Sequence, residues 1–264
     1  MTTTMTYTGT TALITGASSG LGAEFATRFA ARGANLVLVA RRTDRLEDLA
    51  RKLRVAHGIS VTTLSKDLSR PGAGAEVRDE LAGRGIRIDT LINNAGFATS
   101  GPLAEEDPAV IASEISLNVA SLVDTTRAFL PEMLAAGKGA LVNVASTAAF
   151  QPVPGMAVYG ATKAFVLSFT EAVAHETKES GLRVLALCPG ATRTEFFEVL
   201  GSQAAAVGRL QSATEVIDTA LRALDRRTTP VSVVSGWGNR VLAGMAQRLP
   251  RHISLAIAGR AVQD

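Results

Sequence analysis

The sequence predicts a doubly wound α/β fold, in which a parallel sheet of about seven strands is covered by helices on both faces. The first observation behind this prediction is an alternation of short, continuous apolar runs with helical patterns along most of the chain. Continuous apolar runs are typical of parallel strands that are buried on both faces. The second observation is the lack of a linker or an internal repeat, which favours one domain over residues 1–264 rather than two.

The first strand, helix and strand follow a Thr-rich lead-in. A short run of Ala, Leu, Ile and Thr at 10–14 predicts a buried strand, which leads into a glycine-rich turn at 15–22. A helical pattern then continues to about Arg32, and Gly33 is expected to cap its C-terminus. The apolar run at 35–40 predicts the second strand. Because a helix connects the two strands, we expect them to be parallel.

The same alternation continues to residue 234. Helices are predicted at residues 44–57, 73–83, 108–136, 157–180 and 214–226, and strands at residues 60–64, 88–92, 139–144, 182–187 and 231–234. Residues 236–264 are treated as a C-terminal extension. In a sheet of this kind, ligands bind at the carboxyl ends of the strands.

Composition narrows the class of protein. The formal net charge is +3, and Lys and Arg are spread along the chain rather than massed in one block, so nucleic acid binding is not expected. The single Cys188 cannot form an internal disulfide, and the sequence holds no secretion signal and no apolar run of about 18 residues. A cytoplasmic protein that does not bind a membrane is expected. The histidines have no metal-like spacing, so no metal site is predicted.

The glycine-rich turn contains Gly16, Gly20 and Gly22 between the first strand and a helix. Glycines at such a place let the backbone approach a pyrophosphate at the positive end of the helix. The spacing differs from the common Gly-x-Gly-x-x-Gly pattern, and similar turns also serve only to pack a helix on a strand. The position of the turn favours the phosphate-binding interpretation.

Two arginines, Arg41 and Arg42, follow the second strand. A cofactor with a free 2′-hydroxyl would call for an acidic residue there. Arginine instead suits a 2′-phosphate, because its planar fork binds phosphate oxygens in charge-assisted hydrogen bonds. Two solvated arginines before a helix are the plain alternative, but their position favours NADP.

Tyr159 and Lys163 lie four residues apart in a predicted helix, so both side chains share one face. A neighbouring ammonium favours the ionised phenol, and we expect it to lower a tyrosine pKa that is ordinarily about 10. Such a pair can move protons near neutral pH. The spacing also occurs by chance on many helices. Ser146 at a strand end and Asn118 on a helix face are, taken singly, more typical of structural residues.

Taken together and in this order, the motifs resemble the short-chain dehydrogenase/reductase family. The motifs that carry the resemblance are Thr15-Gly16-Ala-Ser-Ser-Gly20-Leu-Gly22, Asn93-Asn-Ala-Gly96, Asn118, Ser146, Tyr159-Gly-Ala-Thr-Lys163 and Pro189-Gly190. The similarity covers nearly all of the chain up to about residue 235. It implies a Rossmann-like oxidoreductase that assembles as a homodimer or homotetramer.

The resemblance also implies residue roles. Tyr159 would be the general acid and base, Lys163 would lower its pKa and bind the nicotinamide ribose, and Ser146 would bind the substrate oxygen. Asn118 would support a water-linked proton relay to Lys163. The positions that match cofactor contacts in similar enzymes are Gly16, Ser18, Ser19, Leu21, Arg41, Arg42, Asp67, Leu68, Asn94, Tyr159, Lys163, Thr192 and Thr194.

Three parts of the chain are expected to determine which substrate is bound. Apolar Phe196, Phe197 and Leu200 follow Pro189-Gly190 in the region that closes over substrate in similar proteins, although they could also pack beneath a loop. Wall candidates between the serine and the tyrosine are Gln151, Val153, Pro154 and Met156. The amphipathic tail from 237 to 262 could cover the substrate, pack on a second subunit or lie on a membrane, and the first two are favoured.

The main functional prediction is an NADP-dependent oxidoreductase that acts on the carbonyl or alcohol of an apolar small molecule. Reduction of a 3-oxoacyl thioester is the rival assignment within the enzyme class. A protein that senses NADP without turnover is the rival outside it; a missing tyrosine or lysine would favour that alternative, and both residues are present.

Overall fold

The computed structural model describes residues 5–195, 210–250, 255 and 258. Its main sheet has seven strands in the order β3-β2-β1-β4-β5-β6-β9, and every neighbouring pair is parallel. The strands are β1 (Thr11–Thr15), β2 (Asn35–Ala40), β3 (Val61–Ser65), β4 (Thr90–Asn93), β5 (Ala140–Val144), β6 (Arg183–Cys188) and β9 (Ser232–Val234). The strand order reverses between β1 and β4, which is where ligands bind in doubly wound sheets. The fold prediction is confirmed.

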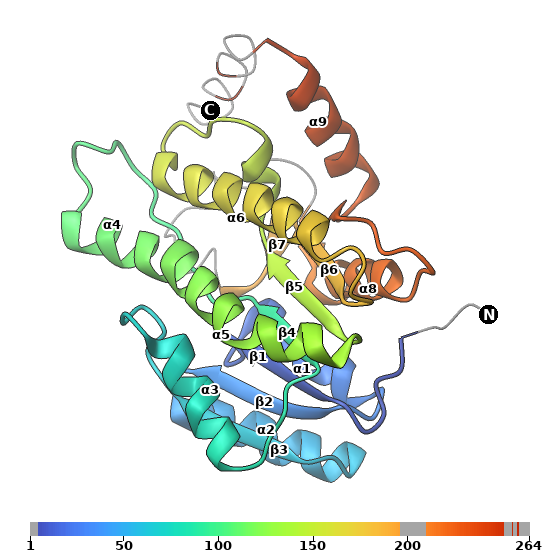
Figure 1. The fold of residues 1–264 in the computed structure, drawn as a ribbon. Coiled ribbons are helices and arrows are strands. Elements are labelled where there is room, and N and C mark those ends of the chain that lie inside the picture. The colour runs from blue at the N-terminus through green and yellow to red at the C-terminus, as the bar shows by residue number, and fades with distance from the viewer. Residues whose placement is uncertain (1–4, 196–209, 251–254, 256–257, 259–264) are drawn as a thin grey trace.

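Helices cover both faces of the sheet, as Figure 1 shows. They are α1 (Gly20–Ala30), α2 (Thr43–His57), α3 (Ala73–Gly83), α4 (Pro108–Ile115), α5 (Ser121–Ala136), α6 (Ala157–Glu176), α8 (Ala213–Leu224) and α9 (Trp237–Arg248). Helix α9 lies beyond the carboxyl ends of the strands, at the top of the view in Figure 1. Within the described ranges, each helix is too short or too polar to cross a membrane.

Alternate residues of each central strand supply two separate cores. In β1, Ile14 packs with Phe25 and Phe29 of α1 in the core beneath α1, α2 and α8. Its neighbour Leu13 packs with Phe129 and the rest of the core beneath α3, α5 and α6. Burying an apolar side chain of this size stabilises the fold by about 1.5–3 kcal/mol. The continuous apolar runs of the sequence therefore exist because the strands are buried on both faces.

Most element boundaries agree with the sequence prediction to within one or two residues, and differences in three of the predicted helices have a structural reason or are larger. The first helix ends at Ala30 with Ala31 as its C-cap, and Gly33, with φ near 80°, ends the turn beyond it rather than capping the helix. The predicted helix at 108–136 is interrupted by a π-helical turn, η1 (Ser116–Ala120), because hydrogen bonding there does not follow the regular i to i+4 pattern. Helix α6 ends at Glu176 rather than at 180.

Two short elements near the carboxyl edge were not predicted. A 3₁₀ turn, η2 (Thr147–Phe150), follows β5, and Ser146 caps it by accepting a hydrogen bond from the Ala148 N–H at 3.1 Å. A parallel pair of strands, β7 (Thr192–Arg193) and β8 (Gln211–Ser212), lies after β6. Both elements form where the chain leaves the sheet, so they fix the loops around the carboxyl ends of the strands.

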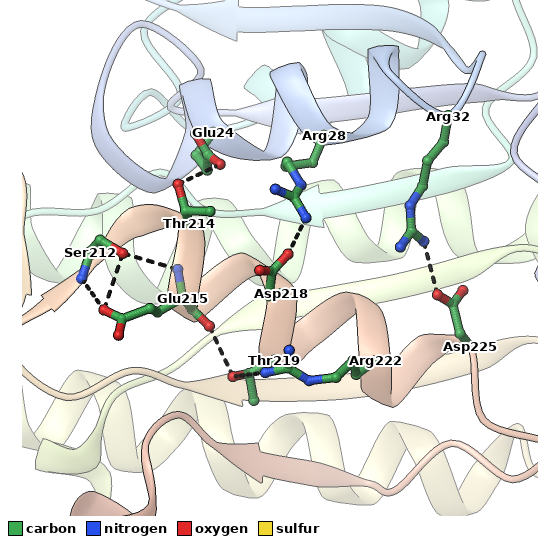
Figure 2. A network of polar contacts seen from close by, with 10 residues as sticks. All are labelled: Glu24, Arg28, Arg32, Ser212, Thr214, Glu215, Asp218, Thr219, Arg222 and Asp225. Carbon is green, nitrogen blue, oxygen red and sulfur yellow. Dashed lines mark hydrogen bonds and ion pairs between the residues drawn. The ribbon is translucent and has the colours of Figure 1, made fainter.

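Polar contacts fasten α8 to α1, and Figure 2 shows this network. Arg28 pairs with Asp218, and Arg32 binds Asp225 at 3.0 Å. The start of α8 is fixed by a capping box, in which Ser212 and Glu215 satisfy each other's backbone N–H groups. These contacts hold α1, and therefore the glycine turn at its N-terminus, against the rest of the domain.

Candidate active site

A cavity of about 680 Å³ opens at the carboxyl ends of the central strands. It collects nearly all of the site residues predicted from the sequence. Those that line it are Gly16, Ser18, Ser19, Leu21, Arg41, Arg42, Asp67, Leu68, Asn94, Ser146, Tyr159, Lys163, Thr192 and Thr194. Asn118 is the exception, since it lies buried behind the cavity wall. Residues distributed over some 180 positions of sequence therefore meet in one place.

The glycine turn is shaped by close backbone approaches. A Cβ on Gly22 would lie 2.3 Å from the carbonyl oxygen of Gly16, and a Cβ on Gly16 would lie 2.9 Å from the Cα of Ala95. Gly16 also has φ near 65°, a conformation that favours glycine. Close packing alone therefore requires glycine at positions 16 and 22. The turn nevertheless leaves the N-terminus of α1 without a side-chain cap, and Ser19, Gly20 and Leu21 line the cavity there. Uncapped N–H groups at a helix N-terminus can bind an anion.

Arg42 forms a fork over the serines of this turn. Its Nε and Nη2 donate to Ser18 Oγ at 3.2 and 3.0 Å, and Nη2 also donates to Ser19 Oγ at 2.8 Å. Its Nη1 donates to a carboxylate oxygen of Glu195 at 3.0 Å. Arg41 is exposed and lines the same cavity. A guanidinium held beside two hydroxyls is a suitable site for a phosphate group.

Asn94 and Thr15 join the ends of β1 and β4. The Thr15 hydroxyl accepts hydrogen bonds from the N–H groups of Asn94 and Ala95, both at 3.0 Å. The Asn94 side-chain amide donates back to the Thr15 carbonyl at 2.9 Å. This reciprocal pair holds the floor of the cavity at the point where the strand order reverses. Thr15 opens the glycine-turn motif of the sequence, and its structural role becomes visible only in the fold.

The remaining predicted residues form the far wall of the cofactor half. Asp67 accepts hydrogen bonds from the N–H and hydroxyl of Ser69, which lower the pKa of its carboxyl. Leu68 is buried beside it. Thr192 donates to the Gly190 carbonyl at 2.9 Å, and a Cβ on Gly20 would lie 3.3 Å from Thr194. The loop after β6 is thus held close to the glycine turn.

Tyr159 and Lys163 lie on one face of α6, as their spacing predicts. The Lys163 ammonium lies 5.6 Å from the centre of the Tyr159 ring and donates to the Val144 carbonyl at 2.9 Å. Ser146, at the end of β5, hydrogen-bonds the Tyr159 side chain. These three residues come from a helix and the strand that it covers, so the regular fold brings them together.

The pKa of Tyr159 differs in direction from the sequence expectation. Burial raises the pKa of the phenol to about 12; the hydrogen bond with Ser146 opposes this rise, and the nearby Glu114 adds to it. Burial also lowers the pKa of Lys163 to about 8, against the opposing effect of Glu114. Because burial disfavours both charged forms, it outweighs the attraction on which the expectation of a lowered tyrosine pKa rested.

Asn118 fixes the chain beneath the cavity. Its side-chain oxygen accepts from the Phe97 N–H at 3.1 Å, and its amide donates to the Phe97 carbonyl at 2.8 Å and to Thr162 Oγ1 at 3.1 Å. A Cβ on Gly96 would lie 2.8 Å from Asn118 Oδ1 and 3.6 Å from Lys163 Nζ. Gly96 therefore lies between the two side chains. The asparagine sits in the π-helical turn, a feature often found at functional sites.

Glu114 is a buried carboxylate that the sequence analysis did not select. One oxygen accepts from the N–H and hydroxyl of Thr99 at 3.0 and 2.9 Å, and the other has no hydrogen-bond partner among the described residues. Burial raises the pKa of its carboxyl. Its charge influences the pKa of both Tyr159 and Lys163. The sequence shows an acid four positions before Asn118, but it does not show that this acid is fully buried.

The other half of the cavity is mainly apolar. Gln151, Val153 and Met156 line it as expected, whereas Pro154 does not. Its further apolar lining consists of Phe97, Ala98, Leu117, Phe150, Leu242, Ala243 and Ala246. The last three belong to α9, so part of the predicted tail covers the cavity. The expected contributions of Phe196, Phe197 and Leu200 lie outside the described residues.

Cys188, His57 and His175 do not add chemistry to this site. The thiol is fully buried, and burial raises its pKa to about 12, which makes it a poor nucleophile. Among the described residues, no group of acidic residues, histidines or cysteine is arranged to hold a metal ion. The cavity thus combines an anion-binding half with a half that carries a serine, a tyrosine and a lysine. Fold and site together define an oxidoreductase that uses a dinucleotide.

Comparison with known proteins identifies the family. The pattern of the short chain dehydrogenase family matches residues 10–205, and the chain belongs to this family. It is 42% identical over 197 residues to sulfoacetaldehyde reductase 2 of Chromohalobacter salexigens, covering 73% of this chain and 77% of that protein.

Two solved structures are similar over most of this chain. A short-chain dehydrogenase from Sphingobium yanoikuyae in complex with NADPH has a TM-score of 0.80 and 38% identity, covering 91% of this chain and 96% of that one. A bulky-bulky ketone specific alcohol dehydrogenase from Comamonas testosteroni has a TM-score of 0.75 and 33% identity, covering 92% and 95%. The chain is thus an enzyme of the short-chain dehydrogenase family that interconverts a carbonyl and an alcohol.

Proposed function

We propose that this enzyme is an NADP-dependent carbonyl reductase or alcohol dehydrogenase whose substrate is an apolar small molecule. One observation carries the proposal: the Arg42 fork on Ser18 and Ser19 opens into the same cavity as Ser146, Tyr159 and Lys163. One half of the cavity fits a phosphorylated dinucleotide, and the other half can protonate an oxygen.

The cofactor half fits NADP on three counts. The N-terminus of α1 has no side-chain cap and adjoins the cavity, so a pyrophosphate can bind its backbone N–H groups. Arg41 and Arg42 supply positive charge where an acidic residue would select a free ribose hydroxyl. Arg42 also has hydroxyl neighbours that can share a 2′-phosphate. The NADPH complex of the Sphingobium relative supports the same choice.

When it is bound, the nicotinamide supplies or accepts the hydride. Ser146 would hold the substrate oxygen, and Tyr159 Oη would pass it the proton. With a pKa raised to about 12, Tyr159 is a neutral phenol near neutral pH. A neutral phenol can donate a proton to a carbonyl oxygen, and its phenolate can accept one from an alcohol. Lys163, held on the Val144 carbonyl, would position the ribose beside the phenol.

The lining of the substrate half favours an apolar substrate. Among the described residues that line the cavity, the cationic side chains are Arg41, Arg42 and Lys66 in the cofactor half, and Lys163 beside the tyrosine. A substrate sulfonate, such as the name of the Chromohalobacter relative implies for that protein, would need a cation beyond Lys163. The described wall instead offers aromatic and aliphatic side chains. We infer a ketone or aldehyde with bulky apolar substituents.

The catalytic assignment is tested by replacing Tyr159 with Phe. The variant should lose turnover by at least about a hundredfold, the usual contribution of a general acid, while it keeps NADPH affinity within a few-fold. Tyr7→Phe is the matched control, because Tyr7 is the chain's other tyrosine and donates to Asp225 away from the cavity. Turnover that survives in Tyr159→Phe would refute the assignment.

The cofactor assignment is tested by Arg41→Ala and Arg42→Ala, with Arg78→Ala as control, because Arg78 is partly exposed and does not line the cavity. Both cavity variants should weaken NADPH much more than NADH, measured by titration calorimetry. Equal weakening of the two cofactors would contradict a role in binding the 2′-phosphate.

The substrate class is tested by following NADPH absorbance with a panel of compounds. The panel should contain bulky ketones, aldehydes and steroids beside sulfoacetaldehyde and a 3-oxoacyl thioester. Preferred turnover of the apolar ketones supports the proposal, whereas preference for either charged substrate overturns the apolar assignment.

The assembly, location and domain organisation of the enzyme remain proposals. We infer a single-domain chain that forms a homodimer or homotetramer and works in the cytoplasm. Phe165 supports assembly, because it is exposed on α6 and stacks on Phe169. Light scattering coupled to size exclusion tests the oligomer, and a monomer at micromolar concentration would contradict it.

A further inference from the structure

Glu195 places a carboxylate at the arginine fork of the cofactor half. One of its oxygens accepts from Arg42 Nη1 at 3.0 Å, and the other accepts from Arg45. Glu195 directly follows Thr194 and lines the same cavity as Ser18 and Arg42. An anion of this chain therefore occupies a position on the guanidinium that would suit an anion of the cofactor.

Arg42 does not depend on Glu195 for its orientation. Three hydrogen bonds to Ser18 and Ser19 already hold its Nε and Nη2 over the glycine turn. The bond to Glu195 is made by Nη1 alone. The carboxylate thus adds negative charge to a fork whose geometry the serines have already fixed.

The carboxylate is ionised at the pH at which the enzyme would work. The hydrogen bond from Arg42 is the largest of the effects that hold the pKa of the Glu195 carboxyl below its usual value, and Arg45 adds to it. A 2′-phosphate also carries negative charge near neutral pH. Two anions on one guanidinium repel each other, so a phosphate entering this fork must displace or oppose the carboxylate.

We propose that Glu195 is an internal competitor for the 2′-phosphate site, which weakens the binding of NADP(H) while leaving NAD(H) unaffected. The inference rests on the proposed role of Arg42 in binding the 2′-phosphate. Glu195 is then a specificity-determining residue, because it reduces the preference for NADP(H) over NAD(H) that Arg41 and Arg42 create.

The expected effect is modest. The side chains of Arg42, Arg45 and Glu195 are each about two-fifths exposed, and solvent screens pairs of this kind strongly. Ion pairs at such positions usually change an equilibrium by about two- to fivefold. The effect should shrink at about 1 M salt, where the Debye length falls to about 3 Å.

The test compares wild type with Glu195→Gln, which keeps the shape of the side chain and removes its charge. Dissociation constants are measured calorimetrically for NADPH, NADH, 2′,5′-ADP and 5′-AMP, at low and at high salt. Glu76→Gln is the matched control, because Glu76 is an exposed carboxylate of α3 that pairs with Arg70. Thermal melting of each variant, and of Glu195→Ala, checks that the fold is kept.

Glu195→Gln should tighten NADPH and 2′,5′-ADP about two- to fivefold at low salt and leave NADH, 5′-AMP and the control unchanged. Unchanged or weaker NADPH binding in Glu195→Gln and Glu195→Ala would overturn the proposal, since the carboxylate would then be neutral or would organise the fork. Arg42→Ala distinguishes a failure of the competitor role of Glu195 from a failure of the proposed phosphate site. If it loses NADPH selectively while Glu195→Gln has no effect, only the competitor role fails. If it does not discriminate between the cofactors, the assignment of the phosphate site fails as well.

Discussion

Replacing Lys163 with Met should stabilise the protein near neutral pH, although Lys163 belongs to the proposed catalytic set. Burial lowers the pKa of its ammonium from the ordinary 10.5 to about 8. Because the folded-state pKa of Lys163 is lowered, the lysine costs the fold no stability above its unfolded pKa. The cost grows as the pH falls from the unfolded pKa to the folded pKa. Below pH 8 the folded state therefore carries the whole cost of the buried charge. At about 1.4 kcal/mol per tenfold change in proton affinity, this cost is about 3 kcal/mol.

The net gain at pH 7 should be smaller than that cost. Lys163→Met also loses the hydrogen bond to the Val144 carbonyl, which is worth about 1 kcal/mol. We therefore expect the free energy of unfolding to rise by about 2 kcal/mol, while methionine fills a similar volume. Turnover should be lost in the same variant, which is the usual conflict between stability and a charged catalytic group.

Urea unfolding of wild type and variant between pH 7 and 10, at one protein concentration, measures this effect. From pH 8 to pH 10 the wild type should gain stability relative to the variant, so the difference in unfolding free energy between the two should shrink. Cys188 and Tyr159, whose folded pKa values are raised, lose stability as the pH rises past their unfolded values of about 9 and 10, but they do so in both proteins and leave this difference to Lys163. The exposed Lys138→Met serves as control. A difference between variant and wild type that stays constant over this range, or a variant that is less stable at pH 7, would refute the reasoning.

Three further variants probe the turn, the network of Figure 2 and the buried acid. Gly22→Ala should abolish cofactor binding and destabilise the fold by about 2 kcal/mol or more, because the new Cβ would lie 2.3 Å from a backbone oxygen. Gly83→Ala is the neutral control, since the space around Gly83 is open. Equal melting temperatures of the two variants would contradict the expected clash. Ser212→Ala should cost about 1 kcal/mol by removing the capping box, measured by urea unfolding; a loss below about 0.3 kcal/mol would show that the cap is unimportant. Glu114→Gln should lower the pKa of Tyr159, so the pH profile of alcohol oxidation should move to lower pH; a profile that stays in place would show that the carboxylate does not act on the phenol.

The regular elements were predictable because their signal is local. The apolar run at 35–40 matches β2 residue for residue, and the pattern at 73–83 matches α3. The π-helical turn at Ser116–Ala120 was not predictable, because nothing in the helical pattern of 108–136 marks it. Its Asn118 is held by the backbone of Phe97 and by Thr162, contacts that exist only in the folded chain.

Among the site residues, motif order in the sequence indicated which side chains would meet, but it did not indicate which charges would act on them. The pairing of Glu195 with Arg42 spans 153 positions of sequence, so no local pattern indicates it. Glu114 lies within a helical pattern, where an acid ordinarily faces solvent. In both cases the missing information was the environment of a charge rather than the identity of a residue.

The same limit explains the pKa of Tyr159. A spacing of four residues establishes that Tyr159 and Lys163 share a helix face, and the expectation of a lowered tyrosine pKa followed from their attraction alone. The folded chain adds two effects of the opposite sign, burial and the negative charge of Glu114. Burial also weakens the premise itself, because with a pKa of about 8 the lysine holds its positive charge less firmly. The phenol therefore keeps its proton near neutral pH in the folded chain, as a result of burial, which motif spacing does not report.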